Sequence, residues 1–218
     1  MSWFVPAPAA HVPRLAAALD IPLRIPRDDA VALTFDDGPH PEGTPAILEA
    51  LGDLHATFFL VGEQVERFPQ HAARVAAAGH EVALHCHEHT LLLRRSTRAV
   101  GEDLARAVGA IEDATGATPR FHRAPYGVYS SGALALVRER WTPVLWSRWG
   151  RDWERRATPE RIARRAARGL RGGDVVLLHD ADWYSAHNSW RRTAAAMASI
   201  LAVVRERGLT AVSLSQSM

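Results

Sequence analysis

The chain has 218 residues, of which 47% are hydrophobic, and its formal net charge is +2. This length supports one sizeable core, so we expect a single domain in the size range of an α/β barrel. We expect no nucleic-acid partner. The single cysteine excludes an intrachain disulfide. No segment approaches the roughly 20 consecutive apolar residues that a transmembrane segment requires.

The N-terminal region contains repeated prolines and charged side chains. Residues 1–26 carry His11, Arg14 and Arg24, which interrupt any continuous apolar core of a signal peptide. Without such a signal, the sequence predicts a cytoplasmic protein. We expect residues 1–30, with a short helix over 13–19, to pack on a domain formed by residues 31–218.

Strand-like apolar runs and amphipathic helices alternate along the rest of the chain. Thr44 and Pro45 are typical of a helix start, and Gly79 is suited to a helix end. Strands are predicted over 31–35, 56–61, 81–85, 121–123, 143–147, 174–179 and 210–214. Helices are predicted over 44–54, 70–78, 97–114, 133–138, 158–168 and 190–207. This alternation favours a parallel sheet covered on both faces.

The positions of the polar residues favour one α/β architecture over another. Seven strand units, with polar residues repeatedly at their C-terminal ends, predict a distorted (β/α)7 barrel whose site lies at that rim. A doubly wound open sheet is the alternative. It would gather its chemistry at one switch point rather than from several strand ends.

A pair of carboxylates, Asp36 and Asp37, follows the first predicted strand directly. Placing both there is costly unless a cation or a proton-transfer role stabilises them. His85 ends another strand and His89 follows one turn later. Asp37 with these two histidines is a ligand set that leaves coordination positions open. A non-haem iron oxygenase uses a similar set, but it requires neither a second aspartate nor the motifs further downstream.

The order of five motifs resembles the polysaccharide deacetylases, the NodB-homology or carbohydrate esterase family 4 enzymes. The resemblance covers about residues 31–214. Its motifs are Thr-Phe-Asp-Asp-Gly at 34–38, the two histidines, Arg-Ala-Pro-Tyr-Gly at 123–127, Asp-Trp at 152–153 and Leu-Leu-His at 177–179. Two positions depart from the family pattern. Cys86 follows the first histidine, and Trp149 stands where relatives often have Asp or Asn.

The resemblance implies a role for each residue of the metal site. Asp36 would be the general base, and Asp37, His85 and His89 would hold a divalent ion. Zinc is the first candidate, with Co²⁺, Ni²⁺ or Mn²⁺ as alternatives. Arg123 would orient the base.

The resemblance also implies the remaining site residues. His179 would protonate the departing amine, and Asp152 would keep this histidine charged. The backbone N–H of Tyr126 would stabilise the oxyanion. The expected substrate-binding residues are Pro125, Tyr126, Trp153 and Leu177.

The function implied by the resemblance is a metal-dependent hydrolase that removes N-acetyl groups from an amino sugar or an N-acetylglucosamine-containing glycan. One alternative is a deacetylase of a phosphate-bearing, lipid- or nucleotide-linked precursor. It is suggested by nine arginines from Arg148 to Arg171, which could equally be a solvated helix face. Another is a catalytically silent sugar-binding member of the fold. The complete set of site residues argues against the silent alternative.

Several other residues near the motifs have simpler interpretations. Cys86 is interpreted as a small core residue rather than a nucleophile. Four further histidines are expected to support the site or lie in loops rather than bind the ion: His40, His80, His87 and His122. Three aromatic residues after His179 would either form a lid over a sugar ring or pack under the rim: Trp183, Tyr184 and Trp190.

Overall fold

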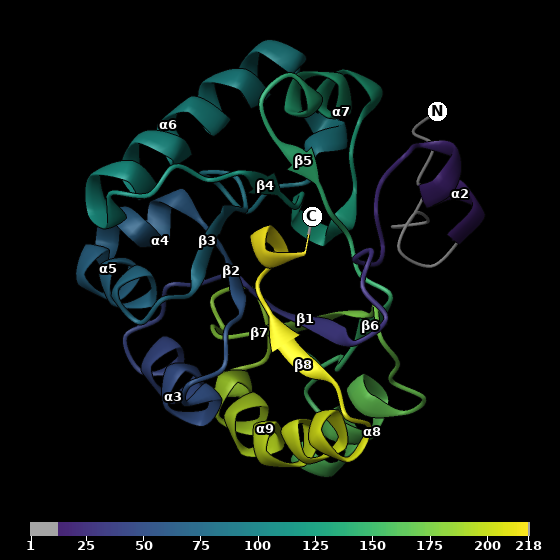
Figure 1. The fold of residues 1–218 in the computed structure, drawn as a ribbon. Helices are drawn as coiled ribbons and strands as arrows, with labels where there is room; N and C mark the ends of the chain where they lie inside the picture. The colour runs from purple at the N-terminus through teal and green to yellow at the C-terminus, as the bar shows by residue number, and fades with distance from the viewer. Residues whose placement is uncertain (1–12, 218) are drawn as a thin grey trace.

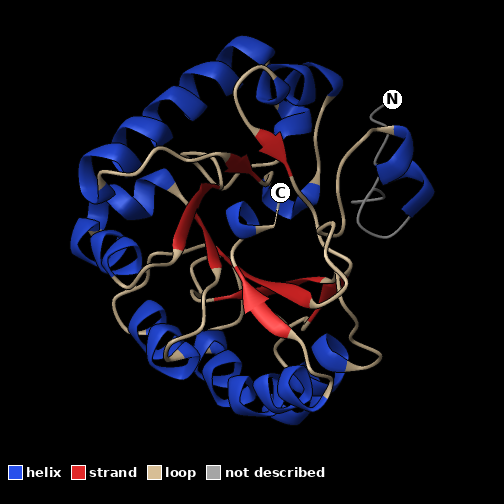
Figure 2. Ribbon diagram, viewed as in Figure 1, coloured by secondary structure: helices blue, strands red, loops and turns tan. Residues whose placement is uncertain are grey.

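The computed structural model describes residues 13–217 of the chain. A curled parallel sheet lies at the centre, and helices surround it (Figures 1 and 2). The predicted α/β barrel class is thereby confirmed. The strands are β1 (Ala30–Asp36), β2 (Thr57–Leu60), β3 (Glu81–Leu84), β4 (Phe121–His122), β5 (Thr142–Pro143), β6 (Arg148–Trp149), β7 (Val175–His179) and β8 (Thr210–Val212). Their order is β5-β4-β3-β2-β1-β7-β6, and β8 pairs with the start of β1.

The helices that follow β1 in the chain cover the outer face of the sheet. The α-helices are α2 (Pro13–Ala18), α3 (Gly43–Leu51), α4 (Gly62–Arg67), α5 (Pro69–Ala77), α6 (Thr97–Thr115), α7 (Ser131–Arg138), α8 (Pro159–Ala167) and α9 (Ser189–Glu206). Three short 3₁₀ turns are η1 (Leu92–Arg94), η2 (Pro125–Gly127) and η3 (Leu214–Gln216). Among the described residues, no helix is long and apolar enough to cross a membrane.

The predicted strand over 143–147 is wrong in its bounds. β5 pairs with β4 at one end of the sheet, and β6 pairs with β7 at the other end. Within the run, the Val144 N–H donates to the His122 carbonyl of β4 and the Ser147 N–H donates to the Val175 carbonyl of β7, both at 3.0 Å, while the Leu145 N–H between them donates to the Pro22 carbonyl, 3.0 Å away. One extended segment, residues 142–149, therefore connects β4 to β7 and completes the curled sheet.

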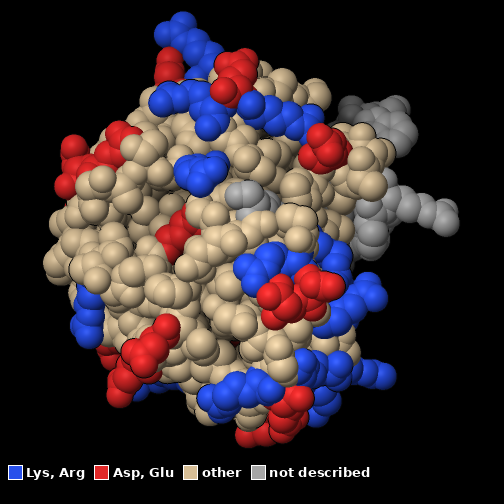
Figure 3. Space-filling view, in the orientation of Figure 1, with Lys and Arg blue, Asp and Glu red and all other residues tan. Residues whose placement is uncertain are grey.

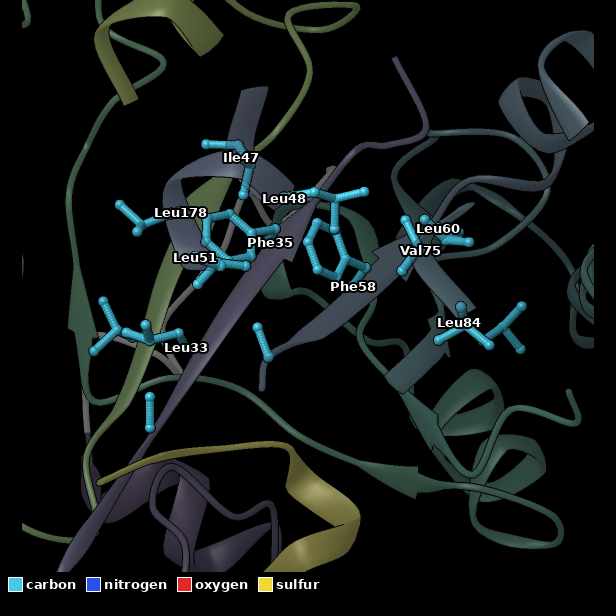
Figure 4. Close-up of a cluster of buried hydrophobic side chains, with 14 of the residues drawn as sticks. Leu33, Phe35, Ile47, Leu48, Leu51, Phe58, Leu60, Val75, Leu84 and Leu178 are labelled. Carbon is cyan, nitrogen blue, oxygen red and sulfur yellow. The ribbon is translucent and has the colours of Figure 1, made fainter. Parts of the chain in front are cut away.

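The alternation of side chains along β1 decides where its polar residues point. Leu33 and Phe35 belong to the cluster between the sheet and the helices, whereas Ala32 belongs to the cluster inside the curl. Phe35 stacks on Phe58 of β2 with ring centroids 5.0 Å apart, and Figure 4 shows the two rings side by side. Because side chains alternate with period two, Asp36 lies on the same face of β1 as Ala32. The strand therefore delivers Asp36 to the interior.

The N-terminal segment contacts the inside of the curled sheet. Ile21 and Ile25 are buried in the inner cluster. Arg24 forms an ion pair with the buried Asp174, next to β7. The part of the predicted N-terminal segment over 1–12, including His11, lies outside the described residues.

α4 was absent from the sequence prediction, which placed only one helix, 70–78, in this region. Its six residues, Gly-Glu-Gln-Val-Glu-Arg, carry no apolar stripe that would indicate a helix. The long-range contacts of its first turn explain its formation. The N–H groups of Gly62 and Glu63 donate to the carbonyls of Cys86 and His87, at 2.9 and 3.0 Å.

Candidate metal and catalytic site

The site begins at the turn that follows β1. Asp37 adopts a left-handed φ of 78°. Gly38 comes next, and a Cβ at this position would lie 2.4 Å from the buried Asp180 carboxylate. Only glycine therefore fits between the turn and Asp180.

Asp37 lies between the two histidines that the sequence identified as ligands. Its Oδ1 atom is 3.4 Å from His85 Nε2 and 3.3 Å from His89 Nε2. Neither contact has hydrogen-bond geometry, and this buried oxygen has no hydrogen-bond partner among residues 13–217. One ligand atom from each residue lies within 4.8 Å of the others. A carboxylate oxygen and two imidazole nitrogens at this separation fit a divalent ion.

The surroundings of the three residues suit metal binding. His85 Nδ1 donates to the Arg123 carbonyl at 2.8 Å, which turns Nε2 toward Asp37. Burial lowers the pKa of His89 to about 4 and keeps it neutral. Burial alone would raise the pKa of Asp37, but His85 and the charged His179 lower it to about 2. Asp37 and His89 are therefore in their metal-binding forms near neutral pH.

Asp36 is held by a fully buried arginine. Arg123 Nη1 donates to Asp36 Oδ1 at 2.6 Å and to Thr34 Oγ1 at 2.9 Å. The other nitrogens of Arg123 donate to the carbonyls of Val144 and Leu145, at 3.1 and 3.0 Å. The second oxygen of Asp36 lies 3.9 Å from His85 Nε2. Asp36 is thus fixed on one side and faces the ligand set on the other.

His179 ends β7, where it pairs in register with Asp36 of β1. Its Nδ1 donates to Asp152 Oδ1 at 2.9 Å, and its backbone N–H donates to Asp152 Oδ2 at 2.7 Å. Thr193 of α9 also donates to Oδ2, at 2.8 Å. Burial lowers the pKa of His179, but Asp152 and Asp37 more than compensate and raise it to about 10. His179 is therefore a charged acid whose Nε2 lies 4.0 Å from Asp37 Oδ2.

These groups line a pocket of about 350 Å³. Three of the predicted substrate-binding residues line it: Tyr126, Trp153 and Leu177. Pro125 is buried and is not among the lining residues. Trp149 lines the pocket, as do three residues that the sequence analysis did not assign to it: Gly127, Trp146 and Ser185. No local sequence pattern identified Trp146 as a pocket residue. Its position in the pocket depends on the bend within residues 142–149, which the sequence did not predict.

The other candidate histidines lie outside the ligand set. His40 supports the turn after β1, where its Nδ1 accepts from the Gly43 N–H at 2.8 Å. His122 is fully buried and contacts the Tyr129 hydroxyl at 2.9 Å. Cys86 is also fully buried, and burial raises the pKa of its thiol, which opposes a nucleophilic role. His80 and His87 are buried away from Asp37, and neither belongs to the ligand set.

The three aromatic residues after His179 take different positions. Tyr184 lines the pocket and stacks on His89. Trp183 stacks on Phe68 instead, and the buried Trp190 lies against His40. Tyr184 therefore agrees with the expected aromatic wall over the site. Trp190 agrees with the alternative, in which the ring packs in the interior.

The nine arginines from Arg148 to Arg171 lie mostly on and around α8. No arginine is among the described residues that line the site pocket. Arg148 donates to the carbonyls of Arg168 and Gly169, while Arg151 and Arg165 pair with Glu154. In Figure 3, basic and acidic side chains lie side by side along the lower right of the view, where Figure 1 places α8.

The fold and the site together define an α/β barrel that brings a carboxylate and two imidazoles together beside a second carboxylate and a charged histidine. Comparison with known proteins agrees with the fold. The family model for polysaccharide deacetylase matches residues 24–140. The chain belongs to the polysaccharide deacetylase family, as the motif order predicted.

Individual relatives show how far the similarity extends. A chitooligosaccharide deacetylase of Bradyrhizobium sp. (strain ANU 289) is 40% identical over 155 residues, which are 69% of this chain and 70% of the relative. A solved peptidoglycan N-acetylglucosamine deacetylase superposes with a TM-score of 0.85 at 26% identity, covering 93% of this chain and 94% of that one. A family 4 pseudoenzyme from Bacillus anthracis superposes with a TM-score of 0.78 at 25% identity, covering 87% and 65%. Because a catalytically inactive protein can have the same fold, the function of this chain has to be inferred from its site residues.

Proposed function

We propose that this protein is a metal-dependent hydrolase that removes N-acetyl groups from an N-acetylglucosamine-containing glycan. The observation that carries the proposal is that the ligand set lies close to two proton-transfer groups at the paired ends of β1 and β7. Asp36 is fixed by Arg123, and its second oxygen lies 3.9 Å from His85 Nε2. His179 is charged by Asp152, and its Nε2 lies 4.0 Å from Asp37 Oδ2.

Asp37, His85 and His89 would hold the ion, with zinc as the first candidate and Co²⁺, Ni²⁺ or Mn²⁺ as alternatives. When bound, the ion would act as a Lewis acid on the amide carbonyl. A non-haem iron oxygenase would share this ligand set, but it would not require His179 as an acid or Asp36 as a base. Oxygen consumption by the iron-loaded protein would distinguish that chemistry.

The side chains around the ligand set would carry out the proton transfers. Asp36 takes a proton from the attacking water, and Arg123 holds the carboxylate in place. The Tyr126 backbone N–H donates to the oxygen that becomes negative. His179 gives its proton to the nitrogen as the carbon–nitrogen bond breaks. The products are acetate and the free amine of the sugar.

The walls of the pocket fit an acetamido group on a longer chain. Trp153 and Leu177 provide an apolar surface for the acetyl methyl. A second pocket of about 700 Å³ shares His89 and Tyr126 with the site. Tyr126 is 54% exposed between the two pockets. The second pocket offers room for neighbouring sugar units, which favours a glycan over a monosaccharide.

Release of acetate from N-acetylglucosamine oligomers of increasing length, and from peptidoglycan fragments, tests this function. Metal content is measured on the same samples. We expect kcat/KM to rise with chain length, and acetate release to be lost after chelation. Binding of the glycans without release of acetate by the metal-loaded protein would instead identify a silent sugar-binding member.

The phosphate-bearing alternative has its own comparison. Matched substrates with and without phosphate are compared by kcat/KM across a salt series, because electrostatic recognition weakens as salt screens it. Since no arginine lines the described site pocket, we expect equal rates. A preference for the phosphorylated substrate at low salt would favour the precursor deacetylase.

A further inference from the structure

The two candidate histidine ligands are held in different ways. His85 is oriented by its hydrogen bond to the Arg123 carbonyl. His89 Nδ1 is buried and has no hydrogen-bond partner among residues 13–217. Metal-binding histidines usually donate their second nitrogen to an acceptor that fixes the ring. Another contact must therefore orient His89.

Aromatic rings supply that contact on two sides of His89. The ring of Tyr184 stacks on His89 with centroids 4.1 Å apart and planes inclined by 9°. Tyr126 meets the same imidazole edge-on at 4.8 Å and 67°. The edge-on contact has a geometry that aromatic pairs prefer, and the stack is a close, nearly parallel one. Together they restrict rotation of His89 about its side-chain bonds.

Tyr184 is itself anchored from outside its loop. Its hydroxyl donates to Glu63 and accepts from Gln64 Nε2 at 3.0 Å, and both partners lie on α4. Gln64 is 3% exposed, so this contact is sheltered from solvent. This part-buried pair of hydrogen bonds fixes the tyrosine ring more firmly than stacking alone.

α4 in turn is bonded to the segment that carries the ligands. The Gly62 N–H donates to the Cys86 carbonyl and the Glu63 N–H donates to the His87 carbonyl. Glu63 thus contacts the ligand segment through its backbone and Tyr184 through its side chain. Tyr184 lies five positions after His179, so the loop that follows the acid is tied to the ligand segment through α4.

We propose that Tyr184 is a positioning residue for metal binding, which holds His89 toward the ion by stacking while Glu63 and Gln64 hold Tyr184. This inference rests on the proposed function, because it takes Asp37, His85 and His89 as the metal site. It assigns the loop between β7 and α9 a role in metal retention as well as in forming the pocket wall.

The test compares metal affinity in four variants of the full chain. Tyr184→Leu removes the ring, Tyr184→Phe keeps the ring but loses both hydroxyl bonds, and Glu63→Ala removes one anchor. Trp183→Phe is the matched control. It breaks the bond from the neighbouring indole to the Pro39 carbonyl, 3.1 Å away, but leaves the stack on His89 intact.

Dissociation constants for Zn²⁺ and Co²⁺ are measured by chelator competition, and the Co²⁺ absorption spectrum reports the ligand geometry. We expect Tyr184→Leu to weaken binding about 10- to 100-fold, as loss of a group that orients a metal ligand commonly does. Tyr184→Phe and Glu63→Ala should fall between this variant and the wild type. Trp183→Phe should bind as the wild type does. Thermal melting without metal confirms that each variant is folded.

Wild-type affinity and an unchanged Co²⁺ spectrum in Tyr184→Leu would overturn the inference. If Tyr184→Leu does not fold, wild-type metal affinity in both Tyr184→Phe and Glu63→Ala would overturn the inference. Equal weakening in Trp183→Phe would assign the effect to the loop in general and reject the specific role of the stack. The proposed function fails by a different result, which is full metal content after His85→Ala and His89→Ala together.

Discussion

Replacement of Arg123 tests how the interior of the barrel supports the catalytic base. Arg123 has the largest side chain among the fully buried described residues. It bonds Asp36 and Thr34 of β1 and the carbonyls of residues 144 and 145. Its guanidinium also lies 4.0 Å from the ring centroid of Phe59. It therefore ties β1 to the segment that completes the curled sheet.

Arg123→Met keeps much of the apolar volume but removes all of these donors. Breaking a buried ion pair by removing one partner costs about 3 to 5 kcal/mol, because a buried charge is left uncompensated. Losing donors to two buried carbonyls adds a cost of about 1 kcal/mol or more. We therefore expect the free energy of unfolding to fall by about 4 to 6 kcal/mol. This is a large part of the roughly 5 to 15 kcal/mol that stabilises a typical domain.

Urea unfolding of the metal-free proteins, followed by tryptophan fluorescence, measures this loss. A double-mutant cycle with Asp36→Asn isolates the ion pair, because the double variant has no unpaired charge at either position. We expect the double variant to be at least about 1 kcal/mol more stable than the sum of the single effects, within the usual range for coupled neighbours. A loss below about 1 kcal/mol for Arg123→Met, or additivity within about 0.5 kcal/mol, would refute the reasoning.

Three further predictions concern the site itself. His85→Ala together with His89→Ala should abolish binding of the divalent ion, as measured by elemental analysis, and retained metal would place the site elsewhere. Asp36→Asn should eliminate acetate release but keep the ion, because it removes the base and no ligand; wild-type turnover would contradict this role. Asp152→Asn removes the charge that raises the pKa of His179. The acid then loses its proton at lower pH, so the alkaline limb of kcat/KM should move to lower pH, and an unmoved limb would exclude this pairing.

The local sequence pattern was sufficient to predict the strands whose ends carry site residues. The apolar run before Asp36 predicted β1, and the run before His85 predicted β3, because a buried strand shows in any sequence as a short apolar segment. Parallel strands place their C-terminal ends at one edge, which is why residues far apart in sequence could be assigned to one site. The side-chain roles came from the family resemblance and not from these patterns.

Other parts of the structure depend on contacts that no local pattern contains. α4 is stabilised by hydrogen bonds to Cys86 and His87, and its Gln64 bonds a tyrosine 120 positions away. The segment 142–149 bends because its two ends pair with strands from different parts of the chain. Thr193 supports Asp152 from α9, yet threonine within a helix has no feature that marks it for this role. Tertiary packing selects these partners after the local elements exist.

The backbone of the site also departs from local preference. Asp37, Cys86 and Tyr126 have left-handed φ values of 78°, 66° and 61°. Such a conformation costs about 1 to 3 kcal/mol for each non-glycine residue, and it persists only where surrounding structure enforces it. Glycine would relieve the backbone at 37 and 126, but it would also remove a ligand carboxylate and the tyrosine ring that contacts His89. The side chain of Cys86 is buried in the core. The backbone turn at Cys86 lies between His85, which directly follows β3, and the segment that leads to His89. The left-handed turns at Asp37 and Cys86 therefore place the ligands, and the packing of Gly38 on Asp180 and the hydrogen bonds from α4 are contacts that hold these two turns.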